Sequence, residues 1–438
     1  MASPILLTAE HGERRPAIPR LIRRNTLLLA ATQAFVGMGS QMVPTLGGLM
    51  IERLLGSVAL AGIATSMIYV ARVLVAYPVG WVMDTYGRKA GLMLGLVLSL
   101  FGAVGVGLSV VWTSFPLFLA GLLVFGLGVG AGQQLRTAAA DMYLPDRRAE
   151  GLGYVLTGSL VGALGGPALI QLAQAGAPLV HLDASALAWL LVPAVLIPSM
   201  GLVFLIRPDP KEIAANLARF YPGYVPAAAA AGTDARLADG ASLRTWLAHY
   251  PLMVGFLATF VVHGIMAMMM ALTPLVMAHH NAGLAAISLA VSMHVVGMYG
   301  LSLPLGRLTD RIGRRMVIVA GLIVSAVGSL LVPITPDYAV SAVGLILVGV
   351  GWSCVNVAVT ALVADTVPAA ERGRAVGIVD SFGGVASIVL PLAGGVLADA
   401  VGFPALALVA TALVLPALAL ALRLAEPHPG RHARALPV

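Results

Sequence analysis

Runs of about 20 apolar residues recur along the whole chain. A run of this length crosses the hydrocarbon core of a bilayer as an α-helix, in which every backbone hydrogen bond is satisfied without water. With 59% hydrophobic and 10% charged residues, the chain also has too little polar surface for a water-soluble domain. The sequence therefore predicts an all-α membrane protein with twelve transmembrane helices, at residues 27–51, 58–83, 90–111, 116–140, 151–175, 184–206, 251–277, 283–306, 316–333, 338–363, 374–398 and 402–422.

A long polar stretch, residues 207–250, divides these spans six and six. We expect a cytoplasmic N-terminal tail (1–26), a six-helix bundle (27–206), a cytoplasmic linker (207–250), a second six-helix bundle (251–422) and a cytoplasmic C-terminal tail (423–438).

The positions of Lys and Arg predict the orientation. Nearly all of the 26 basic residues fall in the segments on the side of the two tails, as the positive-inside rule requires of cytoplasmic segments. The N-terminal tail lacks the apolar core of a signal peptide, so we expect it to be retained. These features predict a multi-pass protein of a bacterial inner membrane with both termini in the cytoplasm. The net charge of +7 comes from these segments and needs no nucleic-acid partner. The single cysteine, Cys354, excludes an intramolecular disulfide.

The two halves repeat one design. "GWVMDTYGRK" (80–89) follows the second span and "GRLTDRIGRR" (306–315) follows the eighth. The glycine of each loop permits a tight turn, and we expect the following arginine to pair with an aspartate at the end of the fourth or tenth span. Such pairs can latch one conformation or only fix the loops, and both interpretations stay open. The gating candidates are Gly80, Asp84, Gly87, Arg88 and Asp141 in the first half and Gly306, Asp310, Gly313, Arg314 and Asp365 in the second.

Twelve spans, the duplication and "GxxxDxxGR[K/R]" in both halves resemble the major facilitator superfamily. The resemblance covers essentially the whole chain. It implies a carrier with a central site between two six-helix bundles, open alternately to each side of the membrane.

Few ionisable residues lie inside the predicted spans, and each of them is a candidate for function. Arg72 lies near the bilayer middle, where it needs an anion, a cluster of carbonyls or a water-filled cavity. Arg136 lies closer to the cytoplasmic surface, and we expect it to snorkel or join the loop latch. Asp380 is the only carboxylate within a span, able to take part in proton movement or to balance a basic group. The other two are His263 and His294.

Methionine and histidine recur together on the seventh and eighth spans. His263, Met266 and Met270 share one helix face, and so do His294 and Met298. Consecutive spans are antiparallel, so residues equally far from their shared outer loop lie at the same depth in the membrane. Met266 would then lie level with His294, and His263 level with Met298, as two rungs of a ladder of ligands. Thioether sulfur and imidazole suit Cu(I) better than Mg, Ca or Mn. The supporting donors would be Met38, Met42, Cys354 and Asn356, with His279 and His280 as a first capture point outside.

"MxxxM" (266–270) and "HxxxM" (294–298) resemble the paired motifs of the CcoA-like copper importers within that superfamily. The resemblance implies that Met266, Met270, His294 and Met298 handle copper as a transported substrate, with no bound cofactor. The expected partners are the copper ion or a small copper complex, the lipid bilayer and protons as a candidate coupling ion.

Other interpretations stay open. Methionine is a common gap-filler, and a histidine in a span often relays protons. "GSLVGALGGP" (158–167) resembles the antiporter signature of proton-coupled drug exporters. An uptake carrier for an organic anion would use Arg72 as a carboxylate clamp. A non-transporting receptor is disfavoured by the duplicated loop, and an enzyme is not expected.

Overall fold

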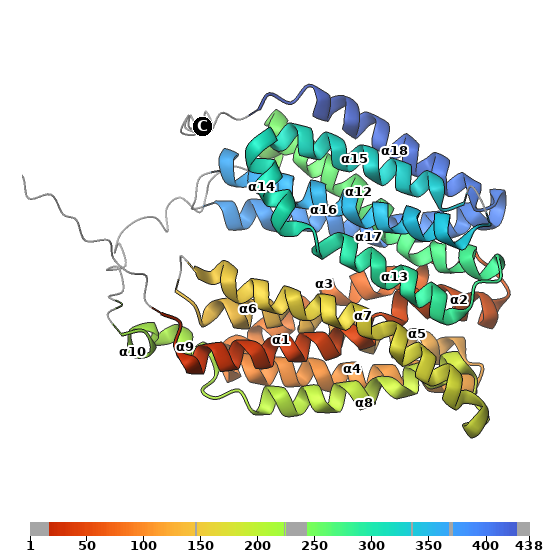
Figure 1. Cartoon of the computed structure of the whole chain (residues 1–438), viewed down its shortest axis with the longest axis horizontal. Coiled ribbons are helices and arrows are strands. Elements are labelled where there is room, and N and C mark those ends of the chain that lie inside the picture. Colours follow the sequence, from red (N-terminus) through yellow and green to blue (C-terminus); the bar gives the residue numbers. More distant parts are fainter. Residues whose placement is uncertain are drawn as a thin grey trace, which may run out of the picture.

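The computed structural model describes residues 17–144, 147–222, 224, 243–333, 336–367 and 371–426, and every regular element in them is an α-helix (Figure 1). The N-terminal half contains α1 (Arg20–Ser40), α2 (Met42–Leu55), α3 (Ile63–Tyr86), α4 (Arg88–Val111), α5 (Phe115–Gly132), α6 (Gln134–Asp141), α7 (Arg148–Val180) and α8 (Ala184–Phe204). The linker contains α9 (Pro210–Ala215), α10 (Leu217–Phe220) and α11 (Leu243–Ala248). The C-terminal half contains α12 (Tyr250–His279), α13 (Leu284–Tyr299), α14 (Ser302–Ile312), α15 (Arg314–Leu331), α16 (Tyr338–Thr366), α17 (Arg372–Val401) and α18 (Pro404–Leu422).

Eleven helical segments of the described chain are long and apolar enough to cross a membrane. The pair α13 and α14, bent by 40° at its break, makes a twelfth if it is one span. The prediction of an all-α membrane protein with about twelve spans is therefore confirmed.

The first span differs from expectation in two ways. It begins at Arg20 rather than at residue 27, because helical hydrogen bonding continues beyond the apolar segment into the polar end. It is also interrupted at Gln41, between α1 and α2. Pro44 follows three residues later and has no backbone N–H to donate to the carbonyl of Ser40, which accounts for the interruption.

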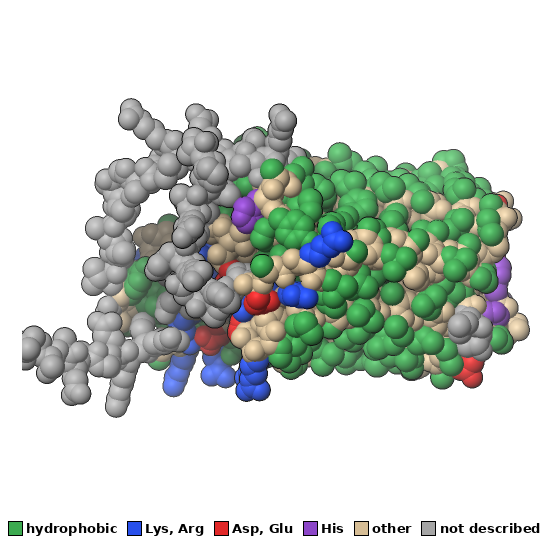
Figure 2. Space-filling model, turned by 90° about the horizontal axis from the view of Figure 1, so that it is seen from above, with side chains coloured by type: hydrophobic (Ala, Val, Ile, Leu, Met, Phe, Trp, Pro, Cys, Tyr) green, Lys and Arg blue, Asp and Glu red, His purple; other side chains and the backbone are tan. Residues whose placement is uncertain are grey.

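The two halves lie side by side, the N-terminal half below and the C-terminal half above in Figure 1. We name the end that carries α9, α10 and α14 the linker end and the opposite one the far end. On the face shown in Figure 2, Lys, Arg, Asp and Glu side chains gather at the linker end, whereas the middle of the molecule is hydrophobic. This distribution agrees with a lipid-covered middle, and the assignment of the linker end to the cytoplasm stays a prediction.

Each half has its own hydrophobic core. In the N-terminal half, Phe125 and Trp189 pack edge to face with ring centroids 5.0 Å apart. In the C-terminal half, Phe256 and Phe382 stack at 5.4 Å. Because each half is packed internally, the halves can move as bodies relative to each other.

The halves are joined at the far end. Ser66 of α3 donates a hydrogen bond to the Ile388 carbonyl of α17 over 2.7 Å, and Ser292 of α13 donates to the Ala163 carbonyl of α7 over 2.6 Å. Toward the linker end the same faces separate. Val73, two helical turns after Ser66 on the face that contacts α17, is 66% exposed. The molecule is thus closed at the far end and open toward the linker end.

Candidate functional site

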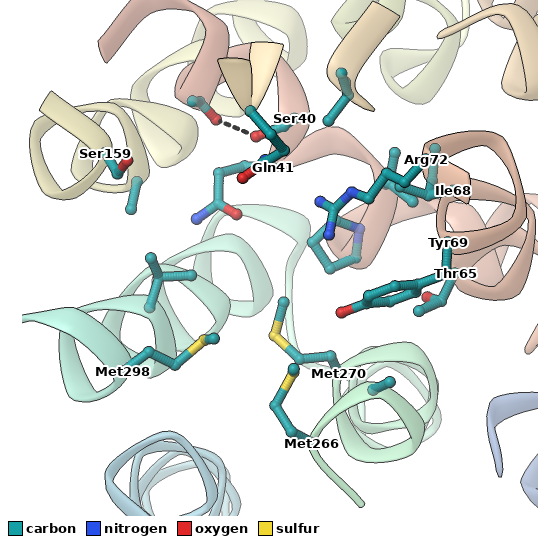
Figure 3. A pocket seen from close by; sticks show the side chains of 18 of the residues that line it. Ser40, Gln41, Thr65, Ile68, Tyr69, Arg72, Ser159, Met266, Met270 and Met298 are labelled. Carbon is teal, nitrogen blue, oxygen red and sulfur yellow. Dashed lines mark hydrogen bonds between the residues drawn. The ribbon is translucent and has the colours of Figure 1, made fainter. Parts of the chain in front are cut away.

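A cavity lies between the two halves near their middle (Figure 3). Its volume is about 180 Å³, close to the roughly 150 Å³ of an engineered protein cavity that holds benzene. Both halves line it, through Gln33, Gly37, Ser40, Gln41, Val43, Pro44, Thr65, Ile68, Tyr69, Arg72, Phe125, Val129, Gln133, Arg136, Ser159 and Ala163 from the first half and Met266, Ala267, Met270, Val295, Met298 and Tyr299 from the second.

The N-terminal half supplies the polar wall. The guanidinium of Arg72 lies over the Tyr69 ring, 4.9 Å from its centroid, and points into the cavity (Figure 3). Gly130 of α5 permits this placement, because a Cβ there would lie 3.0 Å from the Arg72 Cα atom. Arg136 of α6 lies over Tyr299 of the opposite half, at 5.9 Å from the ring centroid. The amides of Gln33, Gln41 and Gln133 complete this wall.

The C-terminal half supplies a wall of thioethers. Met266 and Met270, one turn apart on α12, and Met298 of α13 carry their sulfur atoms toward the cavity (Figure 3). Three of the four residues that the copper-importer resemblance implied therefore lie together at one site.

The two histidines of the predicted ladder do not line this cavity. His294 is fully buried, and its Nδ1 atom lies 2.6 Å from the Leu345 carbonyl oxygen of α16. The Nδ1 atom of His263 lies 3.0 Å from the Thr259 carbonyl oxygen of its own helix, and its ring packs against Trp352 of α16 at 5.3 Å. The rungs expected between Met266 and His294 and between His263 and Met298 are not formed.

The reason for this failure is the position of α16. The ladder assumed that α12 and α13 face each other because they follow one another in sequence. Instead, α16 packs against both of them, and His294 is directed at α16. His263 lies between Trp352 of α16 and α17, where a Cβ on Gly383 would be 3.0 Å from its ring. The methionines reach the cavity. In the described residues no group of three or more His, Cys, Asp or Glu side chains could hold a metal ion.

The expected supporting donors also lie elsewhere. Met38 packs against α7, where a Cβ on Gly165 would lie 2.3 Å from its methyl group. Met42 is fully buried in the core of the N-terminal half, Cys354 is buried beside Gly321 of α15, and Asn356 does not line the cavity.

The outer histidines lie at the far end, away from the cavity. The Nε2 atom of His279 lies 2.6 Å from a carboxylate oxygen of Glu52, a contact that joins the two halves. His280 is exposed beside it. The predicted capture of copper by this pair stays a prediction.

Of Arg136 and Asp380, only Arg136 lies elsewhere than expected, and the role of Asp380 in proton movement or charge balance stays a prediction. Arg136 lines the cavity instead of snorkelling to the surface or joining the loop latch. Asp380 of α17 is exposed but does not line the cavity. It lies three turns before Pro391 on the helix face directed at α3, so it faces the space between the separated linker ends.

The duplicated loops form the expected ion pairs. Arg88 lies 2.8 Å from Asp141 and 3.0 Å from Asp84. In the second half, Arg314 lies 2.8 Å from Asp365 and 3.5 Å from Asp310. A gating role for these pairs stays a prediction, and at Gly80 and Gly306 a Cβ would meet no atom within 4 Å.

A carboxylate that the sequence did not single out binds each loop. Asp209 accepts hydrogen bonds from the backbone N–H groups of Arg88 and Lys89 at 3.0 Å, at the start of α4. Glu426 accepts from Arg314 at 2.6 Å and Arg315 at 3.1 Å, at the start of α15. In each half, the carboxylate that follows the last helix thus caps the N-terminus of the helix that follows the duplicated loop.

The glutamines of the cavity wall were also missed. Gln33, Gln41 and Gln133 lie within or next to apolar spans, where amide side chains are unusual. Uncharged amides in a span are a signal that the sequence alone could have supplied.

A family model described as Major Facilitator Superfamily matches residues 29–249 and 255–437. Among curated proteins, the chain is 29% identical over 366 residues to the uncharacterized MFS-type transporter YddS of Bacillus subtilis, covering 82% of this chain and 81% of YddS. It is 26% identical over 404 residues to the riboflavin transporter RfnT of Brucella anthropi, covering 90% and 96% of the two chains.

Among solved structures, a bacterial homologue of the human lysosomal transporter Spinster, in its inward-facing and unoccupied conformation, superimposes with a TM-score of 0.70 at 13% identity. That match covers 92% of this chain and 97% of the homologue. A mutant of the nucleoside transporter NupG also gives a TM-score of 0.70 at 13% identity, covering 92% of this chain and 99% of the other. These structures share the fold.

Proposed function

The chain belongs to the major facilitator superfamily, whose members are secondary transporters that work by alternating access, and we propose that its cargo is a small organic solute with hydrogen-bond acceptors, not a copper ion. The solute binds in the cavity between the halves. The observation that carries the proposal is the composition of the lining, with two arginines and three glutamines but no carboxylate, histidine or cysteine among the described lining residues.

Copper is the weaker candidate. In its favour, the thioethers of Met266, Met270 and Met298 converge on one cavity, and thioether sulfur is a Cu(I) ligand. Against it, Arg72 and Arg136 place two positive charges in the same cavity without a carboxylate to offset them. In surroundings of low dielectric constant, such charges repel a metal cation, and the same repulsion disfavours a cationic drug.

An organic solute uses both walls. Arginine and glutamine side chains donate hydrogen bonds to carbonyl, hydroxyl or acidic oxygens, while thioethers pack against the faces and edges of rings. The riboflavin transporter RfnT, which matches 90% of this chain, makes riboflavin the first solute to test. Riboflavin has a planar ring system edged by carbonyl groups, which suits both walls, and its length would extend from the cavity toward the open linker end.

The test compares cells that produce the wild type, Arg72→Gln or Met266→Ala for riboflavin uptake and copper content. We expect the wild type to raise riboflavin uptake several-fold above cells with an empty vector, and Arg72→Gln to remove most of that gain. Copper content should equal the vector level in all three strains.

Two outcomes bear on different parts of the proposal. Riboflavin uptake at the vector level would exclude riboflavin as the solute. A copper content that rises with the wild type and falls with Met266→Ala would overturn the assignment of an organic cargo.

A further inference from the structure

Two positive charges in the cavity have no counter-charge among the lining residues that the structure describes. Arg72 on α3 and Arg136 on α6 both line the cavity, and the Nε atom of each is buried without a hydrogen-bond partner. Their guanidinium groups lie over tyrosine rings, which attract a cation but do not neutralise it. No Asp or Glu belongs to the part of the lining that the structure describes.

The nearest carboxylates in sequence are engaged elsewhere or lie outside the lining. Asp141, five residues after Arg136, pairs with Arg88 at 2.8 Å. Asp84, at the end of the helix that carries Arg72, also pairs with Arg88. Asp380 forms no ion pair in the described part of the chain and does not line the cavity. The protein thus leaves the cavity with two charges that an incoming anion can neutralise.

A buried charge without a partner is costly, and that cost falls when a ligand brings the opposite charge. Guanidinium groups form paired, charge-assisted hydrogen bonds with planar or tetrahedral acid groups. Both arginines belong to the N-terminal half, so that half is the side that holds the acid. The three methionines of the opposite half face it and offer an apolar, polarisable surface to a ring.

We propose that the transported solute is an organic anion whose carboxylate or phosphate group is held between Arg72 and Arg136, with its ring against Met266, Met270 and Met298. This inference rests on the proposed function and narrows the preferred solutes to organic acids, so that neutral riboflavin would be a weaker ligand than an acid with the same ring. Because one solute would contact both halves, its binding would favour the conformation in which the halves approach each other around it.

The experiment measures binding of two matched pairs of probes to the purified full-length chain in neutral detergent. One pair is benzoate and benzamide, which differ in charge at one ring substituent. The other is riboflavin 5′-phosphate and riboflavin, which share the flavin ring. In each pair we expect the acid to bind at least about tenfold more tightly, as charge-assisted hydrogen bonds provide.

Three variants test whether the arginines are responsible. Arg72→Gln and Arg136→Gln should each abolish the preference for the acid, and Arg72→Lys should keep part of it because the charge remains. Arg311→Gln, at an exposed position of α14, is the matched control and should bind like the wild type. The lysine variant separates loss of charge from loss of folding.

Equal or tighter binding of both neutral probes would overturn the inference, and so would the absence of binding by all four. A preference for the acid that survives both glutamine variants would overturn the assignment to these arginines. Tight binding of riboflavin alone would agree with the proposed function but would contradict the inference that the solute is an anion. Binding of Cu(I), added as a fifth probe, in place of the other four would contradict both.

Discussion

Two glycines of the duplicated loops have backbone conformations that other residues rarely adopt. Gly87 has a φ of 100° and Gly313 a φ of 94°. A Cβ on Gly87 would also lie 2.7 Å from the Asp209 carboxylate, and one on Gly313 would lie 2.5 Å from that of Glu426. Glycine is therefore needed at each position for two reasons: it permits the turn, and it leaves space for the capping carboxylate.

We predict that Gly87→Ala lowers the free energy of unfolding by about 1–3 kcal/mol, because it adds backbone strain and displaces Asp209. The matched control is Gly80→Ala in α3, where a Cβ would meet nothing within 4 Å. That change should be neutral or stabilise the helix by up to about 1 kcal/mol. Thermal unfolding of the two variants in detergent is the measurement, and equal losses would contradict the argument.

At the level of the helix, the start of α4 and the start of α15 are held in the same way. An arginine side chain at each start pairs with the end of a neighbouring helix, and the free backbone N–H groups donate to a carboxylate that follows the last helix of the same half. The aspartate and glutamate that cap these helices come from segments that the sequence marked only as linker and tail. A carboxylate at a helix N-terminus is stabilised by the helix dipole as well as by its hydrogen bonds.

We predict that Asp209→Asn lowers the stability of the N-terminal half by about 1 kcal/mol, because the amide keeps one acceptor but loses the charge. Glu212→Gln, on the exposed side of α9, removes the same charge three residues away and should have little effect. Hydrogen exchange at the backbone amides of Arg88 and Lys89 reports the change locally. Unchanged exchange in Asp209→Asn would show that the cap adds nothing measurable.

For the whole molecule, the contacts between the halves decide which end is open. At the far end α3 and α17 approach so closely at Gly62 that a Cβ would lie 1.9 Å from the Pro391 carbonyl oxygen. The contact of His279 with Glu52 and the hydrogen bond of Ser292 to Ala163 close the same end. Closure there therefore depends on positions without a side chain, among them Gly62 at the start of α3 and Gly395 of α17, where a Cβ would lie 2.5 Å from the Ala59 carbonyl oxygen.

We predict that Gly62→Val opens the far end, because the halves can no longer meet at Pro391. The measurement is labelling of Ser288→Cys, a fully buried position of α13, with a membrane-impermeant thiol reagent. Labelling should rise several-fold, and the native Cys354 adds little background because it is buried. Gly283→Val, where a Cβ would meet nothing within 4 Å, is the control, and similar labelling of the two variants would contradict this role of Gly62.

The sequence by itself determined the number and approximate position of the spans, the duplication and the ion-pair partners Arg88 with Asp141 and Arg314 with Asp365. Those features follow from hydrophobic run length and from repeated local motifs, which need no knowledge of distant contacts. Only the tertiary structure decided which polar side chains meet. The spans are apolar on every side, so helical periodicity fixes which residues share a face but not which neighbour that face meets. Packing of α16 and α17 beside α12 and α13 took His263 and His294 away from the cavity, whose lining includes Arg72, Arg136 and three methionines.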